Sequence, residues 1–483
     1  MNLSDRDAAW RRELRDAMTA KERTSIPRSV MPMLPADFRI HNNDEVNQGL
    51  SADQAKTEAT RCLDCPDPQC VTGCPVGIDI PGFIKNIQRG DVPAAASVLR
   101  LTSALPAVCG RVCPQERQCE AKCIYNKMKK PPVAIGWLER FAADFERLSG
   151  GKPMVEKLVS NGVKIAVAGS GPCGLSFAGD MAKLGYDVTV YEALHEIGGV
   201  LKYGIPEFRL PNSVVDAELD KLRSLGVKFI PDTVIGKTLS YDDILNEGYA
   251  ALFVASGAGL PRFMGIPGEN FINILSSNEY LTRINLMHGG TEGWATPVPR
   301  GKRVAVIGGG NTAMDSVRTA LRMGAEKAFL VYRRGEDEMP ARREEIEHAK
   351  EEGVEFMTLS NPVEYLADEK GHVRAMRVQR MQLGEPDESG RRSPVAIEGA
   401  IDEIPVDVVV VSVGVSPNPL IPNSFDGLNV TNRGTIAVNE GMQSSLPLVF
   451  AGGDIVRGGA TVILAMGDGR HAAASLHRYL TTK

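Results

Sequence analysis

The feature that most constrains the fold is a unit of strand, glycine turn, helix and strand that occurs twice in the chain. An apolar strand at residues 164–168 leads into a glycine turn, a helix and a second strand at 187–191. The same order returns at residues 303–307 and 328–332. Repeats of this kind build parallel sheets covered by helices. The repeat therefore predicts an α/β chain with two Rossmann-like dinucleotide-binding domains.

The first glycine turn carries the complete fingerprint of a dinucleotide-binding unit. It fits G-x-G-x-x-G, follows a strand, opens a helix, and is followed by Glu192 at the end of the next strand. The glycines allow a tight turn and close approach to a pyrophosphate, and the carboxylate can accept hydrogen bonds from a ribose. A structural turn that carries glycines by chance is the alternative, which this context disfavours. The expected binding residues of the turn are Gly169, Gly171, Pro172 and Gly174.

The second glycine turn, at residues 308–315, differs at the end of the following strand. Arg333 and Arg334 stand where the first unit has Glu192. A carboxylate repels a 2′-phosphate, whereas guanidinium groups can bind one with paired hydrogen bonds. The pattern therefore favours NADPH in the second unit and FAD in the first. The alternative is a solvated arginine pair with the acidic residues 336–338 as partners. The expected NADPH-binding residues are Gly308, Gly310, Asn311, Thr312, Arg333 and Arg334.

A third signal lies near the C-terminus. Residues 448–451 form an apolar strand that is followed by Gly452, Gly453 and Asp454. In many flavoproteins with two dinucleotide units, such a strand returns to the first unit and its aspartate binds the ribityl chain. We therefore expect Gly453 and Asp454 to bind FAD.

Eight of the nine cysteines lie between residues 62 and 123, and such clustering in a cytosolic chain indicates metal or redox chemistry. Their spacing is C-x2-C-x4-C-x3-C-P followed by C-x3-C-P-x5-C-x3-C. Four-cysteine zinc sites use two C-x2-C pairs, of which only one occurs here, and inert thiols have no reason to gather in this way. In ferredoxin-like runs the cysteine before proline ligates the other cluster. Cys62, Cys65 and Cys70 are thus expected to share one iron–sulfur cluster and Cys74 to belong to a second, which the later run completes.

Composition limits the classes of partner. The 483-residue chain has a net charge of −5 with acidic and basic residues interspersed, which argues against nucleic acid and anionic membranes as partners. The first residues lack the apolar run of a signal peptide, and no apolar stretch is long enough to span a bilayer. We therefore expect a soluble, cytoplasmic protein.

Changes in sequence texture suggest three domains. A helical iron–sulfur domain is expected at residues 1–150, with helices at 80–90 and 93–105 and a glycine break at its end. The FAD-binding domain is expected at 151–290 and 420–483, and the NADPH-binding domain at 291–419.

The motifs of this chain occur in the order of the glutamate synthase small (β) subunit family, which the chain resembles over nearly its whole length. Besides the two cysteine runs, they are AVCGRVCPQ at 107–115, GSGPCG at 169–174, YGIPEFRLP at 203–211, GGGNTAMD at 308–315 and GGDIVR at 452–457. The chain is also similar to the large subunit of NADH-dependent ferredoxin:NADP oxidoreductase and to the N-terminal part of dihydropyrimidine dehydrogenase.

The resemblance implies two [4Fe–4S] clusters and a ligand set for each. One would use Cys62, Cys65, Cys70 and Cys123, and the other Cys74, Cys113, Cys119 and Glu139. Spacing alone favours Cys109, which completes a set of eight cysteines, whereas the resemblance makes Cys109 a packing thiol. The alternative for Glu139 is an exposed helix carboxylate paired with Arg140 or Arg147.

The resemblance also implies the flavin contacts. They are Gly169, Gly171, Glu192, Gly199, Asp454, Thr461 and Val462. Arg209 is expected near the isoalloxazine ring, where its charge would stabilise a reduced anionic flavin, and the alternative is an exposed loop arginine.

The function implied by the family is electron supply to a second protein. We expect an NADPH-dependent FAD/iron–sulfur oxidoreductase, the electron-transfer small subunit of glutamate synthase, that passes hydride from NADPH to FAD and single electrons through two clusters to the large subunit. The alternative is the large subunit of an electron-bifurcating NADH-dependent ferredoxin:NADP oxidoreductase, whose partner is a small FAD/[2Fe–2S] subunit with ferredoxin. Residues 104–114 and 459–463 look slightly more like this branch. A scaffold that has lost its chemistry is disfavoured by the intact glycine turns and cysteines.

Overall fold

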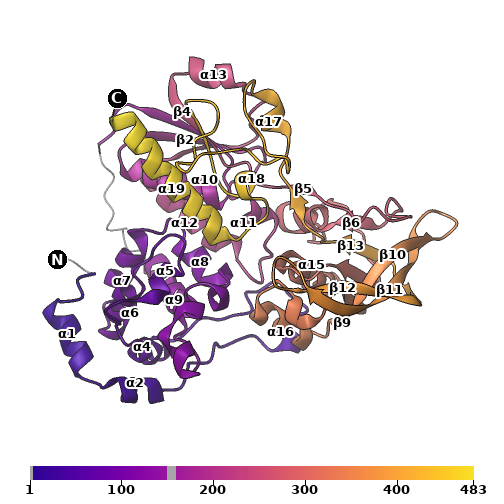
Figure 1. Cartoon of the computed structure of the whole chain (residues 1–483), viewed down its shortest axis with the longest axis horizontal. Helices are drawn as coiled ribbons and strands as arrows, with labels where there is room; N and C mark the ends of the chain where they lie inside the picture. The colour runs from indigo at the N-terminus through magenta and orange to yellow at the C-terminus, as the bar shows by residue number, and fades with distance from the viewer. Residues whose placement is uncertain (1–3, 150–158, 483) are drawn as a thin grey trace.

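The computed structural model describes residues 4–149 and 159–482, which form three packed parts (Figure 1). The helical N-terminal part lies at the lower left, the first dinucleotide unit lies above it, and the second lies at the right. The expected domain end at Gly150 and Gly151 lies outside the described residues. The predicted fold class, two Rossmann-like units preceded by a helical domain, is confirmed.

Capped helices build the N-terminal part. The Asp79 and Asp91 carboxylates each accept a hydrogen bond from a first-turn amide, and a proline follows each cap, both of which favour a helix start. The predicted helices at 80–90 and 93–105 appear as α6 and α7, although α7 ends earlier because a separate helix begins at Pro106. The elements of this part are α1 (Ala9–Asp16), α2 (Ala20–Ser25), α3 (Ala36–Arg39), α4 (Ala52–Arg61), α5 (Gln69–Thr72), α6 (Ile80–Gln88), α7 (Val92–Arg100), α8 (Pro106–Val112), η1 (Gln115–Arg117), η2 (Glu120–Lys122), η3 (Ile124–Met128) and α9 (Ile135–Leu148).

Five parallel strands form the sheet of the first unit, in the order β15-β4-β1-β2-β3. Apart from the edge strand β3, their residues are mostly apolar and buried on both faces, as in parallel sheets covered by helices. The predicted strands at 164–168 and 187–191 are confirmed as β1 and β2, and the C-terminal strand β15 returns to pair with β4. The elements of this unit are β1 (Lys164–Ala168), α10 (Pro172–Lys183), β2 (Asp187–Tyr191), α11 (Val200–Tyr203), α12 (Asn212–Ser224), β3 (Lys228–Ile230), α13 (Tyr241–Asn246), β4 (Tyr249–Val254), α17 (Leu420–Ser424), β15 (Val449–Ala451), α18 (Asp454–Arg457) and α19 (Val462–Thr481).

The second unit repeats this sheet strand for strand, in the order β6-β13-β7-β8-β9. The predicted strands at 303–307 and 328–332 are confirmed as β7 and β8, and with them the internal repeat. The elements of this unit are β6 (Ile274–Ser276), α14 (Ser277–Leu281), η4 (Thr282–Leu286), β7 (Arg303–Ile307), α15 (Asn311–Arg322), β8 (Lys327–Tyr332), η5 (Glu336–Glu338), α16 (Arg343–Glu351), β9 (Glu355–Thr358) and β13 (Val408–Val411).

A second, antiparallel sheet covers one face of this unit and was not predicted. It consists of β10 (Ser360–Ala367), β11 (Val373–Pro386) and β12 (Arg392–Pro405), and it extends to the right in Figure 1. Tyr365 and Met376 of this sheet share a buried cluster with Ile307 and Val331 of the parallel sheet. The inserted sheet therefore takes the place that a covering helix would have.

Two passages of the chain connect the dinucleotide units. They pair with each other as the antiparallel strands β5 (Leu260–Pro261) and β14 (Val415–Ser416). Strand β6, which follows the first passage, pairs with β13 of the second sheet, although the expected boundary at residue 290 leaves it with the first unit. We propose that the second unit begins before Ile274.

One continuous hydrophobic core joins the N-terminal part to the first unit. Leu105 and Val108 of the N-terminal part belong to the same buried cluster as Phe177 of α10, Leu219 of α12 and Met466 of α19. The second unit has separate clusters on the two faces of its sheet. The cysteine-bearing part therefore shares its hydrophobic core with the first unit, whereas polar contacts such as the ion pair of Arg39 with Glu352 at 2.8 Å join it to the second.

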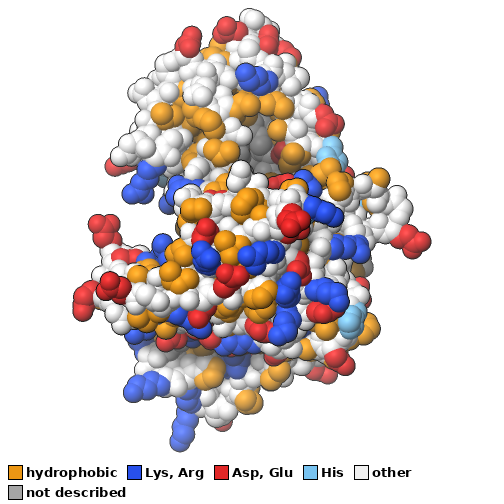
Figure 2. Space-filling model, turned by 90° about the vertical axis from the view of Figure 1, so that its right-hand side faces the viewer, with side chains coloured by type: hydrophobic (Ala, Val, Ile, Leu, Met, Phe, Trp, Pro, Cys, Tyr) orange, Lys and Arg blue, Asp and Glu red, His pale blue; other side chains and the backbone are white. Residues whose placement is uncertain are grey.

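The surface on the side of the second unit carries both signs of charge. Figure 2 shows lysine, arginine, aspartate and glutamate side chains side by side on this face. Such mixing agrees with the interspersed charges of the sequence.

Candidate functional site

The first glycine turn is closed by two glycines that have no room for a side chain. Gly169 has a φ of +107°, and a Cβ on it would lie 2.4 Å from the carbonyl oxygen of Ala255. A Cβ on Gly174 would lie 2.1 Å from the carbonyl oxygen of Gly169. A Cβ on Gly171, by contrast, would meet nothing within 4 Å. The start of α10, at Pro172, therefore faces open space, which suits an anionic group at a helix N-terminus.

Glu192, at the end of β2, forms hydrogen bonds with this turn. Its Oε2 accepts hydrogen bonds from the Ser170 amide at 2.9 Å and the Ser170 hydroxyl at 2.5 Å, and its Oε1 accepts one from the Leu194 amide at 3.0 Å. Gly199 packs against the same turn, because a Cβ on it would lie 2.9 Å from the Gly171 Cα. The structure thus brings Glu192 and Gly199 to the turn, together with Ser170, which the pattern of glycines did not single out.

The C-terminal segment reaches the first unit through β15. Gly453 has a φ of +74°, and its amide donates to Asp468 at 3.1 Å. Asp454 accepts a hydrogen bond from the Ala460 amide at 3.2 Å, and burial raises the pKa of its carboxyl to about 6. Thr461 caps α19, whose first residue is Val462. Sequence reasoning missed Asp468, since its role depends on the contact between α19 and this loop.

The second glycine turn has the same design. A Cβ on Gly308 would lie 2.3 Å from the carbonyl oxygen of Ser412, whereas one on Gly310 would meet nothing within 4 Å. Asn311 begins α15, and its side-chain oxygen accepts a hydrogen bond from the Arg342 amide at 2.9 Å. Thr312, the next residue of α15, is exposed. This helix also presents its N-terminus to open space.

The two arginines that follow β8 have different surroundings. Arg333 is exposed, whereas Arg334 is buried and donates from Nη2 to Asp387 at 2.6 Å. The Nε and Nη1 groups of Arg334 are buried without a hydrogen-bond partner in the described part of the chain. The acidic residues 336–338 do not neutralise Arg334, because Glu336 pairs with Lys350 and Glu338 with Arg392. Asp387 was missed because it lies 53 residues away, in the turn between β11 and β12.

The first set of cysteines gathers near the N-terminal helices. Burial, with the neighbouring sulfurs of Cys62 and Cys123, raises the pKa of Cys65, and the same two sulfurs act on Cys70. All four side chains are partly exposed. The structure therefore brings Cys62, Cys65, Cys70 and Cys123 within electrostatic reach of one another.

The second set lies deeper and includes a carboxylate. Burial raises the pKa of Cys74 to about 11 and that of Cys119 well above its usual value, and Glu139 contributes to both shifts. A hydrogen bond with Cys109, followed by burial, raises the pKa of Cys113. The structure therefore groups Cys74, Cys113 and Cys119 around Glu139.

Glu139 is buried in α9 rather than exposed. Its side chain is 6% exposed, and its Oε1 has no hydrogen-bond partner among the described residues. Burial raises the pKa of its carboxyl to about 8. The alternative of an exposed helix carboxylate is wrong, because Arg140 pairs with Glu45 and Asp144, and Arg147 with Asp144.

Cys109 also borders the second set, but it has partners of its own. Its thiol donates to the sulfur of Met466 at 3.4 Å and is fully buried. Among the described residues, no three Cys, His, Asp or Glu side chains converge closely enough for a single metal ion.

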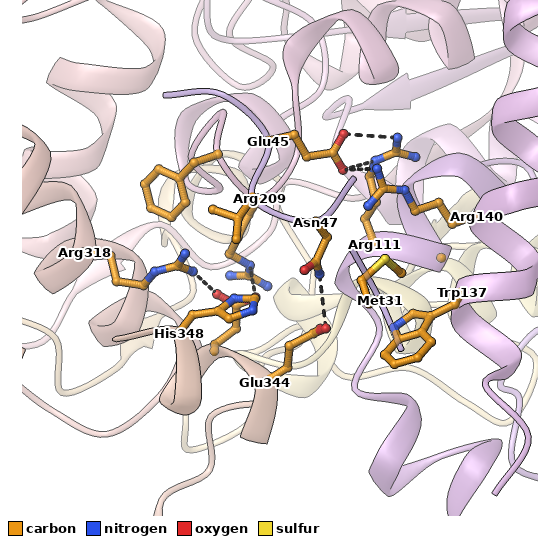
Figure 3. Close-up of a pocket in the computed structure, with 14 residues that line it drawn as sticks. Met31, Glu45, Asn47, Arg111, Trp137, Arg140, Arg209, Arg318, Glu344 and His348 are labelled. Carbon is orange, nitrogen blue, oxygen red and sulfur yellow. Dashed lines mark hydrogen bonds and ion pairs between the residues drawn. The ribbon is translucent and has the colours of Figure 1, made fainter. Parts of the chain in front are cut away.

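Arg209 lies where the three parts meet, beside a cavity of about 20 Å³ (Figure 3). Its Nη1 donates to both carboxylate oxygens of Asp315 at 2.7 Å, and its Nε lies 3.3 Å from Glu345. The side chain is 8% exposed, so the alternative of an exposed loop arginine is wrong. Because both carboxylates belong to the second unit, these ion pairs fix a loop of the first unit to α15 and α16.

Comparisons with known proteins place this arrangement in a family. Residues 39–150 match the model of dihydropyrimidine dehydrogenase domain II, 4Fe-4S cluster, and residues 163–469 match that of pyridine nucleotide-disulphide oxidoreductase. The glutamate synthase [NADPH] small chain of Halomonas elongata is 36% identical, over 92% of this chain and 95% of that protein. The small chain of Escherichia coli K12 is 35% identical, over 93% and 96%. The chain belongs to the glutamate synthase small-chain family.

The glutamate synthase small-chain family has relatives with other names. A Geobacter sulfurreducens protein named NADPH-Fe(3+) oxidoreductase subunit beta is 34% identical, over 97% of this chain and 71% of that protein. Mycobacterium tuberculosis FprA in complex with NADPH has the same fold over 66% of this chain and 85% of its own, with a TM-score of 0.56 at 21% identity. None of the described helices is long and apolar enough to cross a bilayer.

Proposed function

We propose that the chain is an NADPH-dependent FAD/iron–sulfur oxidoreductase that delivers electrons to a second protein subunit. The observation that carries the proposal is Glu139, a buried carboxylate with an unpartnered oxygen among three cysteines. It lies in a part of the chain that shares its core with a glycine-turn unit. Buried polar atoms without partners are rare in native proteins, so a missing ligand is the simplest reason for this one.

The first unit would hold FAD. Its pyrophosphate would lie at the open N-terminus of α10, and Glu192 keeps accepting capacity on Oε1 for a ribose hydroxyl, because only one protein donor occupies that oxygen. The proposed binding residues are Gly169, Gly171, Pro172, Gly174, Glu192, Gly199, Gly453, Asp454, Thr461 and Val462.

The second unit would hold NADPH. The two unfilled donors of Arg334, with the exposed Arg333 beside it, fit a 2′-phosphate. The proposed binding residues are Gly308, Gly310, Asn311, Thr312, Arg333 and Arg334.

The cysteines would hold two [4Fe–4S] clusters. The first set supplies Cys62, Cys65, Cys70 and Cys123, and the second supplies Cys74, Cys113, Cys119 and Glu139. Cys109 is proposed as a packing residue, since its thiol bonds to Met466. In an anaerobic preparation, Glu139→Ala should change the electron paramagnetic resonance signal of one cluster, and Cys109→Ala should change neither. The reverse result would exchange the two assignments.

FAD, NADPH and the clusters would supply the redox chemistry, and the residues of the chain would hold them in place. When bound, FAD converts the two-electron hydride of NADPH into single electrons that the clusters carry. The glycine turns orient the dinucleotides, the arginines select the phosphate, and the shared core fixes the cysteines beside the first unit. The proposed role of Arg209 at the flavin stays a prediction, because Asp315 and Glu345 already oppose its charge.

Anaerobic purification followed by cofactor analysis tests this function. We expect one FAD and two clusters' worth of iron and sulfide per chain, and oxidation of NADPH in preference to NADH with an artificial acceptor. A protein without flavin or iron after anaerobic purification would contradict the proposal.

The partner is proposed to be the large subunit of glutamate synthase, because the Halomonas and Escherichia relatives are named as its small chains. The alternative partner is a small FAD/[2Fe–2S] subunit that works with ferredoxin. Anaerobic co-purification from the native cell distinguishes a large synthase chain from a small flavin-containing one.

A further inference from the structure

Four lysines gather on the exposed segment around Cys123. Lys122 precedes this cysteine, Lys127 lies in η3, and Lys129 and Lys130 follow η3. Between them, Ile124 is 36% exposed and Met128 is 39% exposed. We call these six residues the lysine face. Lys130 donates to the Thr24 carbonyl of α2 at 2.7 Å, so the lysine face adjoins α2, at the lower edge of Figure 1.

No carboxylate neutralises this face in the part of the chain that the structure describes. Two acidic side chains of the adjoining elements η2 and α2 have other partners, since Glu120 pairs with Arg28 at 2.9 Å and Glu22 caps its own helix at Thr19. The lysine face therefore combines positive charge with exposed apolar side chains, in contrast to the mixed charges of the surface in Figure 2.

The position of the face follows from the order of the two cysteine sets. The second set lies against the first dinucleotide unit. Gln118, next to Cys119, donates to Thr461 at 3.4 Å, and the Pro75 carbonyl, next to Cys74, would lie 3.0 Å from a Cβ on Gly467 of α19. The first set lies toward the N-terminal helices, where Arg11 pairs with Asp64 at 2.7 Å. All four of its cysteines are partly exposed, whereas in the second set Cys113 and Cys119 are buried and Cys74 is partly exposed. The first set is thus the outer one, and the lysine face begins beside its last member, Cys123.

We propose that the lysine face is the docking surface for an acidic electron-accepting protein. The inference rests on the proposed function, in which the clusters pass single electrons to a second protein, and the outer position of the first cysteine set makes that set the point of exit. Lysines around an apolar centre match the polar rim and apolar core of transient interfaces, and complementary charge speeds the encounter. Each NADPH gives up two electrons and becomes NADP⁺ with release of one proton, and two acceptor molecules gain one electron each.

Binding of a plant-type [2Fe–2S] ferredoxin, an acidic protein, tests the proposal. Calorimetric titrations would use the anaerobically purified holoprotein and its K122E/K127E/K129E variant. We expect the variant to bind ferredoxin about tenfold more weakly or worse, because charge complementarity is reversed at the interface. Added salt should weaken binding by the parent much more than by the variant, since it screens exposed charges.

Two further variants keep the test interpretable. K228E/K237E/K370E makes the same charge change at exposed lysines of the two dinucleotide units and should alter ferredoxin binding by less than about twofold, because those lysines belong to other elements than the lysine face. K122Q/K127Q/K129Q removes charge without reversal and should give an intermediate loss. Iron and sulfide content must equal that of the parent in every variant.

Three outcomes would overturn the proposal: equal losses in both glutamate triples, no loss in either, or no binding of ferredoxin by the parent. Reduction of a neutral benzoquinone by NADPH separates this failure from failure of the proposed function. Quinone reduction with unaltered ferredoxin binding removes only the docking surface, whereas its absence in the parent removes the proposed function.

Discussion

The two dinucleotide units have the same strand order but differ in the side chain that follows their second strand. It is an acid with protein partners in the first unit and an arginine with unfilled donors in the second. In the first unit Glu192 accepts three hydrogen bonds, from the amide and hydroxyl of Ser170 and from the Leu194 amide, so the protein itself occupies most of the carboxylate. In the second unit Arg334 keeps two buried donors without a partner. The first unit is therefore largely completed by its own chain, whereas the second leaves charge for a ligand to complete. A tightly held cofactor in the first unit and an exchanging one in the second would fit this difference.

Substitution of the third glycine of the first turn should give the largest difference between the two units. Gly174→Ala places a methyl group against the Gly169 carbonyl, and overpacking of this kind costs about 1–3 kcal/mol or more. We expect the purified variant to retain less than about a tenth of the parent's flavin, since a tenfold loss needs only about 1.4 kcal/mol. Flavin absorbance per chain measures it.

The second unit provides the matched control for this change. Ala313 already stands at the corresponding position and is fully buried. Ala313→Gly should retain flavin and lose only about 1 kcal/mol of stability, the usual cost of glycine in a helix. Equal flavin loss in both variants would show that the two turns do not differ in this way.

The residues after the edge strands give the next largest effect. Asp454 is the third residue after β15 and is largely buried, whereas the third residue after β6 is Glu279, which is exposed and pairs with Arg283 at 2.6 Å. Burial raises the pKa of Asp454 to about 6 in the folded chain, so the folded state holds this proton more tightly than the unfolded state does. Stability is therefore lost as pH rises from about 4 to about 6. In flavin-free protein, Asp454→Asn should restore up to about 3 kcal/mol above pH 6 and little near pH 4.

Urea unfolding of the flavin-free parent and variant at pH 4.5 and 7.5 checks this prediction. The difference in unfolding free energy between the two proteins should be larger at the higher pH. A difference that is the same at both pH values would mean that Asp454 does not titrate in this range.

Arg334 should give a smaller and more selective effect. Arg334→Ala removes charge-assisted hydrogen bonds, each worth about 1.5–3 kcal/mol, so NADPH should bind about 10–100-fold more weakly. NADH lacks the 2′-phosphate and should bind nearly as before. Fluorescence titration with both nucleotides measures the two affinities, and equal losses would remove the 2′-phosphate from Arg334.

Arg333 should give the smallest effect of the series. It is exposed, and exposed ion pairs contribute at most about 1 kcal/mol, so Arg333→Ala should weaken NADPH binding by no more than about fivefold. The loss should shrink as salt is added, because exposed charges are screened. A loss as large as that of Arg334→Ala would show that the two arginines share the phosphate equally.

Local patterns in the sequence predicted the repeated unit accurately. They did not predict contacts between residues that are far apart in the chain. The strands β1, β2 and β7 begin and end where the apolar runs do, because parallel strands buried on both faces are nearly continuous apolar segments. The antiparallel sheet that covers the second unit was missed, since its strands alternate buried and exposed residues outside the repeated unit. Asp387 lies in the turn between two strands of that sheet, so the partner of Arg334 was missed with it.

The burial of individual polar side chains was the other property that could not be predicted from the sequence. Spacing favoured Cys109 as a ligand, yet it could not show that Glu139 would be enclosed with a free oxygen. It also could not place Arg209 against Asp315, which is 106 residues away. Both facts depend on how helices from different parts pack against each other, and no short motif encodes that.

The hydrophobic core that spans the N-terminal part and the first unit limits how this protein can be divided or reused. An engineer who transplanted the cysteine-bearing helices alone would leave Leu105 and Val108 without the α12 and α19 side chains that cover them. Such a fragment would expose a broad apolar face and tend to aggregate. The smallest portable cassette is therefore the helices together with the first dinucleotide unit. The second unit has hydrophobic clusters of its own and can be exchanged if its replacement keeps the partners of Arg209, Asp315 and Glu345.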